Sequence, residues 1–178
     1  RLGSAAEEGL GELGMEAAAF RVELTPRESP DAHGAESVEF HVSANRGEPL
    51  LPLARVASGG ELSRIMLALK QIIAERDPVS TLVFDEVDTG ISGRVAAAVG
   101  RRLGQLSQTR QTLVITHLPQ IASGADAHFS VRKSEQGDRT VTEVVALEGQ
   151  DRAQEIAGLL AGEQVSDTAL RHAQEMLE

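Results

Sequence analysis

Four consecutive residues in the middle of the chain, Ser58-Gly59-Gly60-Glu61, directly precede a run of helical periodicity. Ser and Glu at this spacing are typical of a capping box, in which Ser58 accepts a hydrogen bond from the Glu61 N–H and Glu61 reaches back to Ser58. A cap does not explain two glycines in a first helical turn, since each costs up to about 1 kcal/mol relative to alanine. Glycines at a helix N-terminus let an anion approach the exposed N–H groups. We therefore favour phosphate recognition and keep capping as the alternative.

Two adjacent carboxylates, Asp85 and Glu86, follow the short apolar run 81–84. A buried strand that ends in carboxylates is also common at an ordinary sheet edge, which is the plainer interpretation. The functional interpretation is a Walker B strand, in which Asp85 holds Mg²⁺ through its water shell because that ion prefers oxygen ligands. Glu86 would then orient and deprotonate a water for attack on a phosphoryl group.

His117 ends a second apolar run, 112–116, and Asp88 follows the two carboxylates closely. If the two runs are neighbouring parallel strands, His117 lies beside Asp85 and Glu86, where its imidazole could donate to a terminal phosphate. A single histidine is more often a structural hydrogen-bond donor, and that alternative stays open. Asp88 is ambiguous, because it could simply cap the next helix.

The primary phosphate-binding loop is missing from these residues. The chain has only two lysines, Lys70 and Lys133, and neither follows a glycine. The pattern G-x-x-x-x-G-K-[ST] is therefore absent. The sequence predicts half of a nucleotide site.

Composition narrows the function classes further. The chain has 178 residues, 41% of them hydrophobic, no cysteine and a formal net charge of −10, which predicts a folded protein and disfavours a general binder of phosphate backbones. Four phenylalanines without tyrosine or tryptophan give little surface for stacking on bases. Arg94, Arg101 and Arg102 could form a local basic stripe, although a solvated helix face is the favoured interpretation. Short apolar runs and the lack of a leader predict a cytoplasmic protein without membrane contact.

Hydrophobic periodicity predicts the elements that must position these residues. Strands 81–84 and 112–116 flank a helix around 95–106, which predicts a βαβ unit with a parallel sheet, each strand being covered on both faces. The other expected elements are a short acidic helix over 4–13 ended by Gly14, strands near 18–24 and 38–42 joined by a loop over 25–34, a helix over 58–73, a hairpin of 127–133 with 139–147, and helices at 151–161 and 166–177. The fold class is α/β.

Taken in order, the motifs resemble the C-terminal half of an ABC-type ATPase head. Ser58–Glu61 matches the signature, 82–86 the Walker B motif, Asp88 the D-loop and His117 the switch histidine. The segments VASGGELSRIMLALK, TLVFDEVDTGISG and VITHLPQIA are similar to the RecN family of bacterial DNA repair proteins, which are related to SMC proteins. Ala57 stands where many transporters have leucine, which favours the RecN-like branch over a transporter subunit.

The resemblance implies that residues 1–14 are the end of a coiled-coil arm and 15–178 the C-terminal lobe of the head. This lobe would have a mainly parallel sheet with flanking helices and an N-terminal β-hairpin. The P-loop would lie on an N-terminal lobe of the same polypeptide. ATP and Mg²⁺ are then the implied cofactors, and neither is expected to bind tightly to this chain alone.

The resemblance also implies a mechanism in which two heads enclose two ATP molecules as an ATP-dependent homodimer. Asp85, Glu86 and His117 would serve the nucleotide of their own head, and Ser58 to Glu61 would contact the nucleotide of the opposing head. The full-length assembly would bind DNA in double-strand break repair and recombination, in the cytoplasm near the nucleoid. The alternatives are a head lobe of another SMC or ABC ATPase, or a non-catalytic ABC-like docking module.

Overall fold

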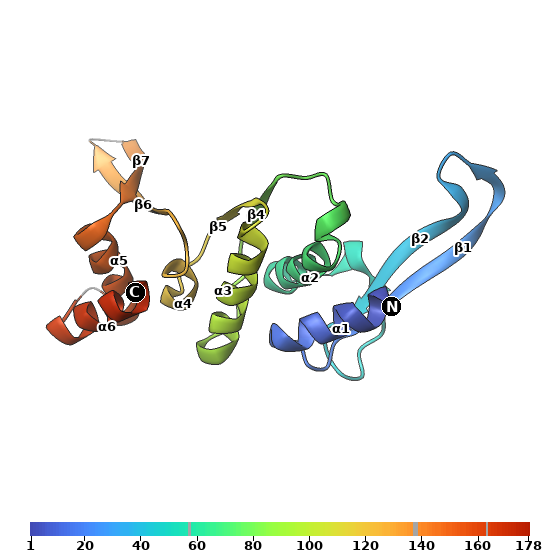
Figure 1. The fold of residues 1–178 in the computed structure, drawn as a ribbon, viewed down its shortest axis with the longest axis horizontal. Coiled ribbons are helices and arrows are strands. Elements are labelled where there is room, and N and C mark those ends of the chain that lie inside the picture. Colours follow the sequence, from blue (N-terminus) through green and yellow to red (C-terminus); the bar gives the residue numbers. More distant parts are fainter. Residues whose placement is uncertain (57, 137–138, 163) are drawn as a thin grey trace. The chain divides into compact units, whose positions relative to one another are not determined.

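The computed structural model describes residues 1–56, 58–136, 139–162 and 164–178 (Figure 1). The chain divides into two compact units, Arg1–Ile115 and Thr116–Glu178. The elements of the first unit are α1 (Leu2–Glu12), β1 (Ala19–Asp31), β2 (Gly34–Ser43), β3 (Leu51–Pro52), a 3₁₀ turn (Leu53–Arg55), α2 (Gly59–Ile72), a second 3₁₀ turn (Ala74–Arg76), β4 (Thr81–Phe84), α3 (Gly93–Ser107) and β5 (Gln111–Val114). Those of the second unit are α4 (Pro119–Ala122), β6 (His128–Gln136), β7 (Arg139–Leu147), α5 (Gly149–Ala161) and α6 (Asp167–Leu177).

Helix α1 ends where the sequence predicts, at Gly14. The Gly14 N–H donates to Gly11 O at 3.2 Å and the Met15 N–H donates to Leu10 O at 3.0 Å, which is the Schellman arrangement. Gly14 has a φ of +81°, and a Cβ there would come within 2.8 Å of Val95 Cγ1. Glycine is therefore required at this helix end by conformation and by space.

Helix α1 is anchored to the rest of the first unit at its C-terminal end. Leu10 and Leu13 are fully buried, and α1 packs on α2 and β1 (Figure 1). Arg102 of α3 donates from Nε and Nη2 to Glu12 Oε2 at 2.9 and 2.5 Å, and from Nη1 to Gln71 Oε1 of α2 at 3.1 Å. The same arginine that the sequence placed in a candidate basic stripe thus joins three helices.

The first hairpin is longer than predicted. Its alternating apolar residues pair as expected, with Phe20 opposite Val42, but pairing continues past Pro26 to Asp31 opposite Gly34. The prediction of a loop over 25–34 is therefore wrong. Among the strands that the structure describes in this sheet, β1 pairs with β2 alone and is therefore an edge strand. An edge strand tolerates prolines, which lack an N–H.

Helices α2 and α3 each contribute several buried residues to the core of the first unit. The α3 residues Val99, Leu103 and Leu106 are buried as predicted. The apolar spacing over 62–73 predicts a helix face made of Leu62, Ile65, Met66, Leu69, Ile72 and Ile73. In the structure Ile65 and Leu69 of this face are buried together with Leu67, whereas Ile72 and Ile73 are 39% and 41% exposed.

Strands β4 and β5 form the predicted parallel pair, with Thr81 opposite Gln111 and Phe84 opposite Val114. The expectation that both faces are covered is wrong. Leu82 and Phe84 are buried, whereas Val83 is 65% exposed, Leu113 49% and Ile115 58%. Within this chain the parallel sheet has one packed face and one apolar face open to solvent.

An ion pair joins the end of α2 to the segment before β4. Lys70 Nζ lies 2.5 Å from Asp77 Oδ2, and the Asp77 side chain is only 6% exposed. The hydrogen bond from Lys70 lowers the pKa of Asp77, and the Val79 N–H, which donates to Asp77 Oδ1 at 3.1 Å, lowers it further. The folded protein thus holds the Asp77 proton more weakly than the unfolded chain does.

We expect Asp77→Asn to lower the urea midpoint of the chain at pH 7. Because the pKa is lowered by folding, the stabilisation is complete above the ordinary aspartate pKa of about 3.9 and disappears as the pH falls through the lowered value. The difference between the variant and the wild type should therefore shrink steadily from about pH 5 downward. Asp126→Asn, at an exposed position, is the control. A difference that stays constant down to pH 2 would contradict this assignment.

The second unit contains the predicted hairpin and C-terminal helices. Strands β6 and β7 pair from His128 opposite Leu147 to Gln136 opposite Arg139, and the turn at 137–138 lies outside the described residues. Ile156 and Ala157 of α5 pack with Ala173 of α6 and Ala122 of α4. The hairpin leaves an apolar face open, which consists of Phe129, Val131 and Val144, each at least 59% exposed.

The architecture confirms the α/β class. Each unit contains a β-hairpin, and the first unit also contains the parallel pair. Within the described ranges, no helix is both long enough and apolar enough to cross a bilayer.

Candidate functional site

The signature residues form the N-terminal end of α2. Ser58 is the N-cap, with extended backbone, and its Oγ accepts a hydrogen bond from the Glu61 N–H at 3.3 Å. The capping interpretation of Ser58 is therefore confirmed. Ser58 and Glu61 are half-buried and Gly59 is exposed, so the first turn of α2 is accessible from solvent.

The two glycines of the motif have different surroundings. Gly60 is buried, and a Cβ there would lie 2.9 Å from Thr89 Cβ and 3.0 Å from the Glu86 carbonyl oxygen. A Cβ at Gly59 would overlap Oε2 of the Glu86 side chain. Gly60 is thus required by close packing, which the sequence did not predict. Gly59 leaves room for the Glu86 carboxylate.

Asp85 and Glu86 follow β4 and are both exposed. Glu86 has a φ of +56°, the one left-handed residue other than glycine among those the structure describes. Its carbonyl accepts from the Thr89 N–H at 3.0 Å and so closes a tight turn. The carboxylate of Glu86 lies over Gly59. The structure therefore brings the Glu86 carboxylate and Gly59 of the predicted signature together within the first unit.

Two α2 residues that sequence analysis did not single out hold this turn. Ser63 Oγ donates to Asp85 O at 2.6 Å, and Arg64 Nη1 donates to Val87 O at 3.4 Å and to Thr89 O at 2.9 Å. Burial lowers the pKa of Arg64, and the nearby Glu61 raises it in part. An arginine four residues after Gly60, on the face of α2 that includes the buried Ile65 and Ala68, was the available signal.

Asp88 is 3% exposed within the same turn. The alternative that Asp88 caps the next helix is wrong, because α3 begins at Gly93 with Ser92 as its N-cap. Asp88 instead lies between Val87 and Thr89, whose carbonyl groups accept hydrogen bonds from Arg64.

His117 belongs to the second unit. Its side chain is exposed, and it follows Thr116, whose Oγ1 accepts from the Leu118 N–H at 3.0 Å. The predicted approach of His117 to Asp85 and Glu86 stays a prediction.

Asp85 is the residue best suited to a magnesium ion. Among the residues that the structure describes, no three acidic or histidine side chains form a metal cage. Mg²⁺ does not need one, since it usually keeps several waters and takes one or two carboxylates together with phosphate oxygens. An exposed carboxylate at the carboxyl end of β4 fits that requirement.

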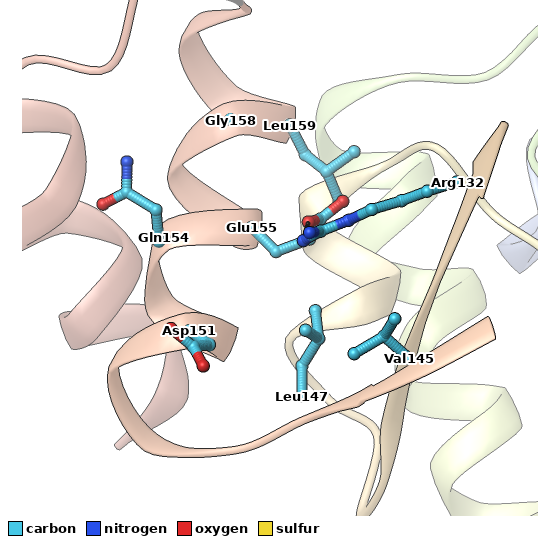
Figure 2. Close-up of a pocket in the computed structure, with 8 residues that line it drawn as sticks. All are labelled: Arg132, Val145, Leu147, Asp151, Gln154, Glu155, Gly158 and Leu159. Carbon is cyan, nitrogen blue, oxygen red and sulfur yellow. Dashed lines mark hydrogen bonds and ion pairs between the residues drawn. The ribbon is translucent and has the colours of Figure 1, made fainter. Parts of the chain in front are cut away.

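A cavity of about 480 Å³ lies elsewhere, between the β6–β7 hairpin and α5 (Figure 2). Arg132 and Glu155 form an ion pair across it, with 3.5 Å between Nη2 and Oε2. Val145, Leu147 and Leu159 line it with Asp151, Gln154 and Gly158. Its lining includes none of the catalytic or nucleotide-binding residues that the sequence predicts.

The chain is similar to curated proteins and to solved structures. No protein-family profile matches the chain. The DNA repair protein RecN of Treponema pallidum is 48% identical in an alignment of 174 residues that covers 94% of this chain and 30% of the relative. The chain thus spans about a third or less of the curated relatives it matches.

Two solved structures share the fold. An Smc head domain with a coiled coil and joint from Pyrococcus yayanosii gives a TM-score of 0.62 at 21% identity, covering 92% of this chain and 29% of that one. A structure described as concerning ATP-driven dimerisation and DNA-stimulated activation of SMC ATPases gives 0.52 at 21% identity, covering 92% of both chains. At these identities the likeness concerns the fold alone.

Proposed function

Because the chain resembles the C-terminal lobe of the RecN head, we propose that it forms half of an SMC-like ATPase that acts in DNA double-strand break repair and recombination. ATP would be bound and hydrolysed once the lobe joins its N-terminal counterpart and two heads pair. The observation that carries this proposal is the packing of the accessible tip of α2 against the turn that bears Asp85 and Glu86. The two motifs, which would serve two different nucleotides, thus contact each other within this chain.

Three residues would serve the nucleotide of their own head. Asp85 would hold Mg²⁺ through water, and the bound ion would supply neutralisation of the phosphate charge. Glu86 would accept a proton from the water that attacks the γ-phosphorus, while ADP leaves on the opposite side. His117 would donate a hydrogen bond to the terminal phosphate.

The tip of α2 would serve the nucleotide of the opposing head. Exposed N–H groups at a helix N-terminus attract phosphate, and Ser58 and Gly59 leave them accessible. Gly60 allows the close packing beneath the tip. Glu61 keeps the first turn capped through its N–H bond to Ser58, and Asp88 lies in the D-loop, which would face the partner head. ATP would in this way link two heads, and hydrolysis would release them.

The open apolar faces support the N-terminal lobe of the same polypeptide as a partner. The first unit exposes Val83, Leu113 and Ile115, and the second exposes Phe129 and Val131. A two-stranded sheet is marginal by itself, and contiguous exposed apolar residues mark an interaction surface. The relatives extend well beyond this chain, so additional chain is present in them that could cover such faces. DNA would be bound by the complete assembly.

The experiment compares this chain with the full-length protein. We expect no measurable ATP turnover from the purified chain, because no P-loop lysine is present. Co-purification with the N-terminal lobe should restore turnover. Robust hydrolysis by the chain alone would contradict the proposal, as would an inactive full-length protein under conditions in which it binds ATP.

A further inference from the structure

Helix α2 holds the turn after β4 through alternate carbonyl groups. Ser63 Oγ donates to the carbonyl of Asp85 at 2.6 Å, and Arg64 Nη1 donates to those of Val87 and Thr89 at 3.4 and 2.9 Å. Both donors come from the second turn of the helix whose first turn carries the signature. The carbonyl groups of the turn are therefore restrained by the same helix whose tip the Glu86 carboxylate contacts.

The held turn has a strained backbone. Glu86 has a φ of +56°, a left-handed conformation that is unfavourable for a residue with a Cβ. Such a conformation persists when the surroundings determine it, and it is concentrated at functional sites. Here the surroundings are Gly60, which has no room for a Cβ against the Glu86 carbonyl, and the carbonyl bonds from α2. The direction of the Glu86 side chain follows from this backbone.

Stability alone does not account for an arginine at position 64. Its side chain is 7% exposed, and its Nε has no hydrogen-bond partner among the residues that the structure describes. Burying a charged group is costly, and a hydrophobic residue of similar size often stabilises a protein as well or better. What the guanidinium provides and a methionine cannot is a fixed pair of bonds to the carbonyls of Val87 and Thr89.

We infer that Arg64 and Ser63 are positioning residues that orient Glu86 for attack on the nucleotide and connect it to the signature tip on the same helix. This inference rests on the proposed ATPase function. Helix α2 carries the signature at its tip and Ser63 and Arg64 one turn later. A shift of α2 caused by the phosphate of the opposing head would therefore also move the turn that bears Glu86. Neither Arg64 nor Ser63 touches the nucleotide.

The test uses the full-length protein with Arg64→Met, Arg64→Lys and Ser63→Ala. For Arg64→Met we expect kcat to fall on the order of 10–100-fold, with the KM for ATP unchanged within about threefold. Arg64→Lys keeps one donor group and should lose less. Amide hydrogen exchange in residues 86–91 should accelerate in Arg64→Met, since the turn loses its restraint. Arg171 is at an exposed helix position, and Arg171→Met is the matched control. It should change neither kcat nor the hydrogen exchange of residues 86–91.

Two results would overturn the inference: an unchanged kcat with unchanged exchange in residues 86–91, or a kcat that falls only in proportion to the loss of folded protein. If Arg64→Met does not fold, Ser63→Ala takes its place, with Ser63→Thr as the rescue that restores the hydroxyl. Should the wild type hydrolyse no ATP, the proposed function fails, whereas the exchange measurement still decides whether Arg64 holds the turn.

Discussion

Gly59→Leu in the full-length protein should prevent ATP-dependent pairing of heads while leaving ATP binding intact. Gly59 is exposed at the tip of α2, where a large side chain would cover the N–H groups that the opposing nucleotide needs. We expect the dimer to weaken on the order of 100-fold, which corresponds to about 3 kcal/mol. Gel filtration with ATP measures the pairing, and fluorescence of a labelled ATP measures binding to the single head.

The variant also displaces Glu86, because a Cβ at position 59 overlaps that carboxylate. Pairing is therefore measured in a Glu86→Gln background, in which hydrolysis no longer empties the site. Gly104→Leu on α3 is the control, since a Cβ there meets open space. Pairing of Gly59→Leu heads at the level of this control would rule out a role for the α2 tip in dimerisation.

Glu86→Gln should lower the rate of hydrolysis by about 10²–10⁴-fold, as expected for the loss of a general base. The amide keeps the size of the side chain but cannot accept the proton of the attacking water. Because Glu86 is exposed, we expect no loss of folding, and ATP should still bind and hold heads together for longer. Single-turnover hydrolysis measures the chemical step directly.

Glu28→Gln, at an exposed position on β1, is the matched control for loss of one negative charge. A Glu86→Gln protein with turnover near that of the wild type would mean that another group accepts the proton. Asp85 would then be the next candidate, since it is the adjacent exposed carboxylate.

Much of the fold was predictable because hydrophobic periodicity reports which face of an element is packed. It predicted α2, α3, the β4–β5 pair and the second hairpin. It failed at Pro26, where polarity suggested a loop and the chain continues as an edge strand. It also failed at Val83 and Leu113, because an apolar run predicts that a face will be covered without telling which polypeptide covers it.

The sequence predicted which residue types form the site, but it did not predict the contacts that require them. Ser58 and Glu61 could be recognised as a cap from their spacing. The need for glycine at position 60 comes from Thr89 and the Glu86 carbonyl, which are distant in sequence. Likewise, Arg64 looked like one more charged residue of a helix, and only its contacts with Val87 and Thr89 give it a role.

The linkage of Glu12, Arg102 and Gln71 has a mechanical consequence. We expect a movement of α1 to be passed to α2 through these hydrogen bonds and through the packing of the buried Leu10 and Leu13. These hydrogen bonds do not involve the long β1–β2 hairpin. Such a movement would act on α2, the helix whose N-terminal end carries Ser58 and Gly59.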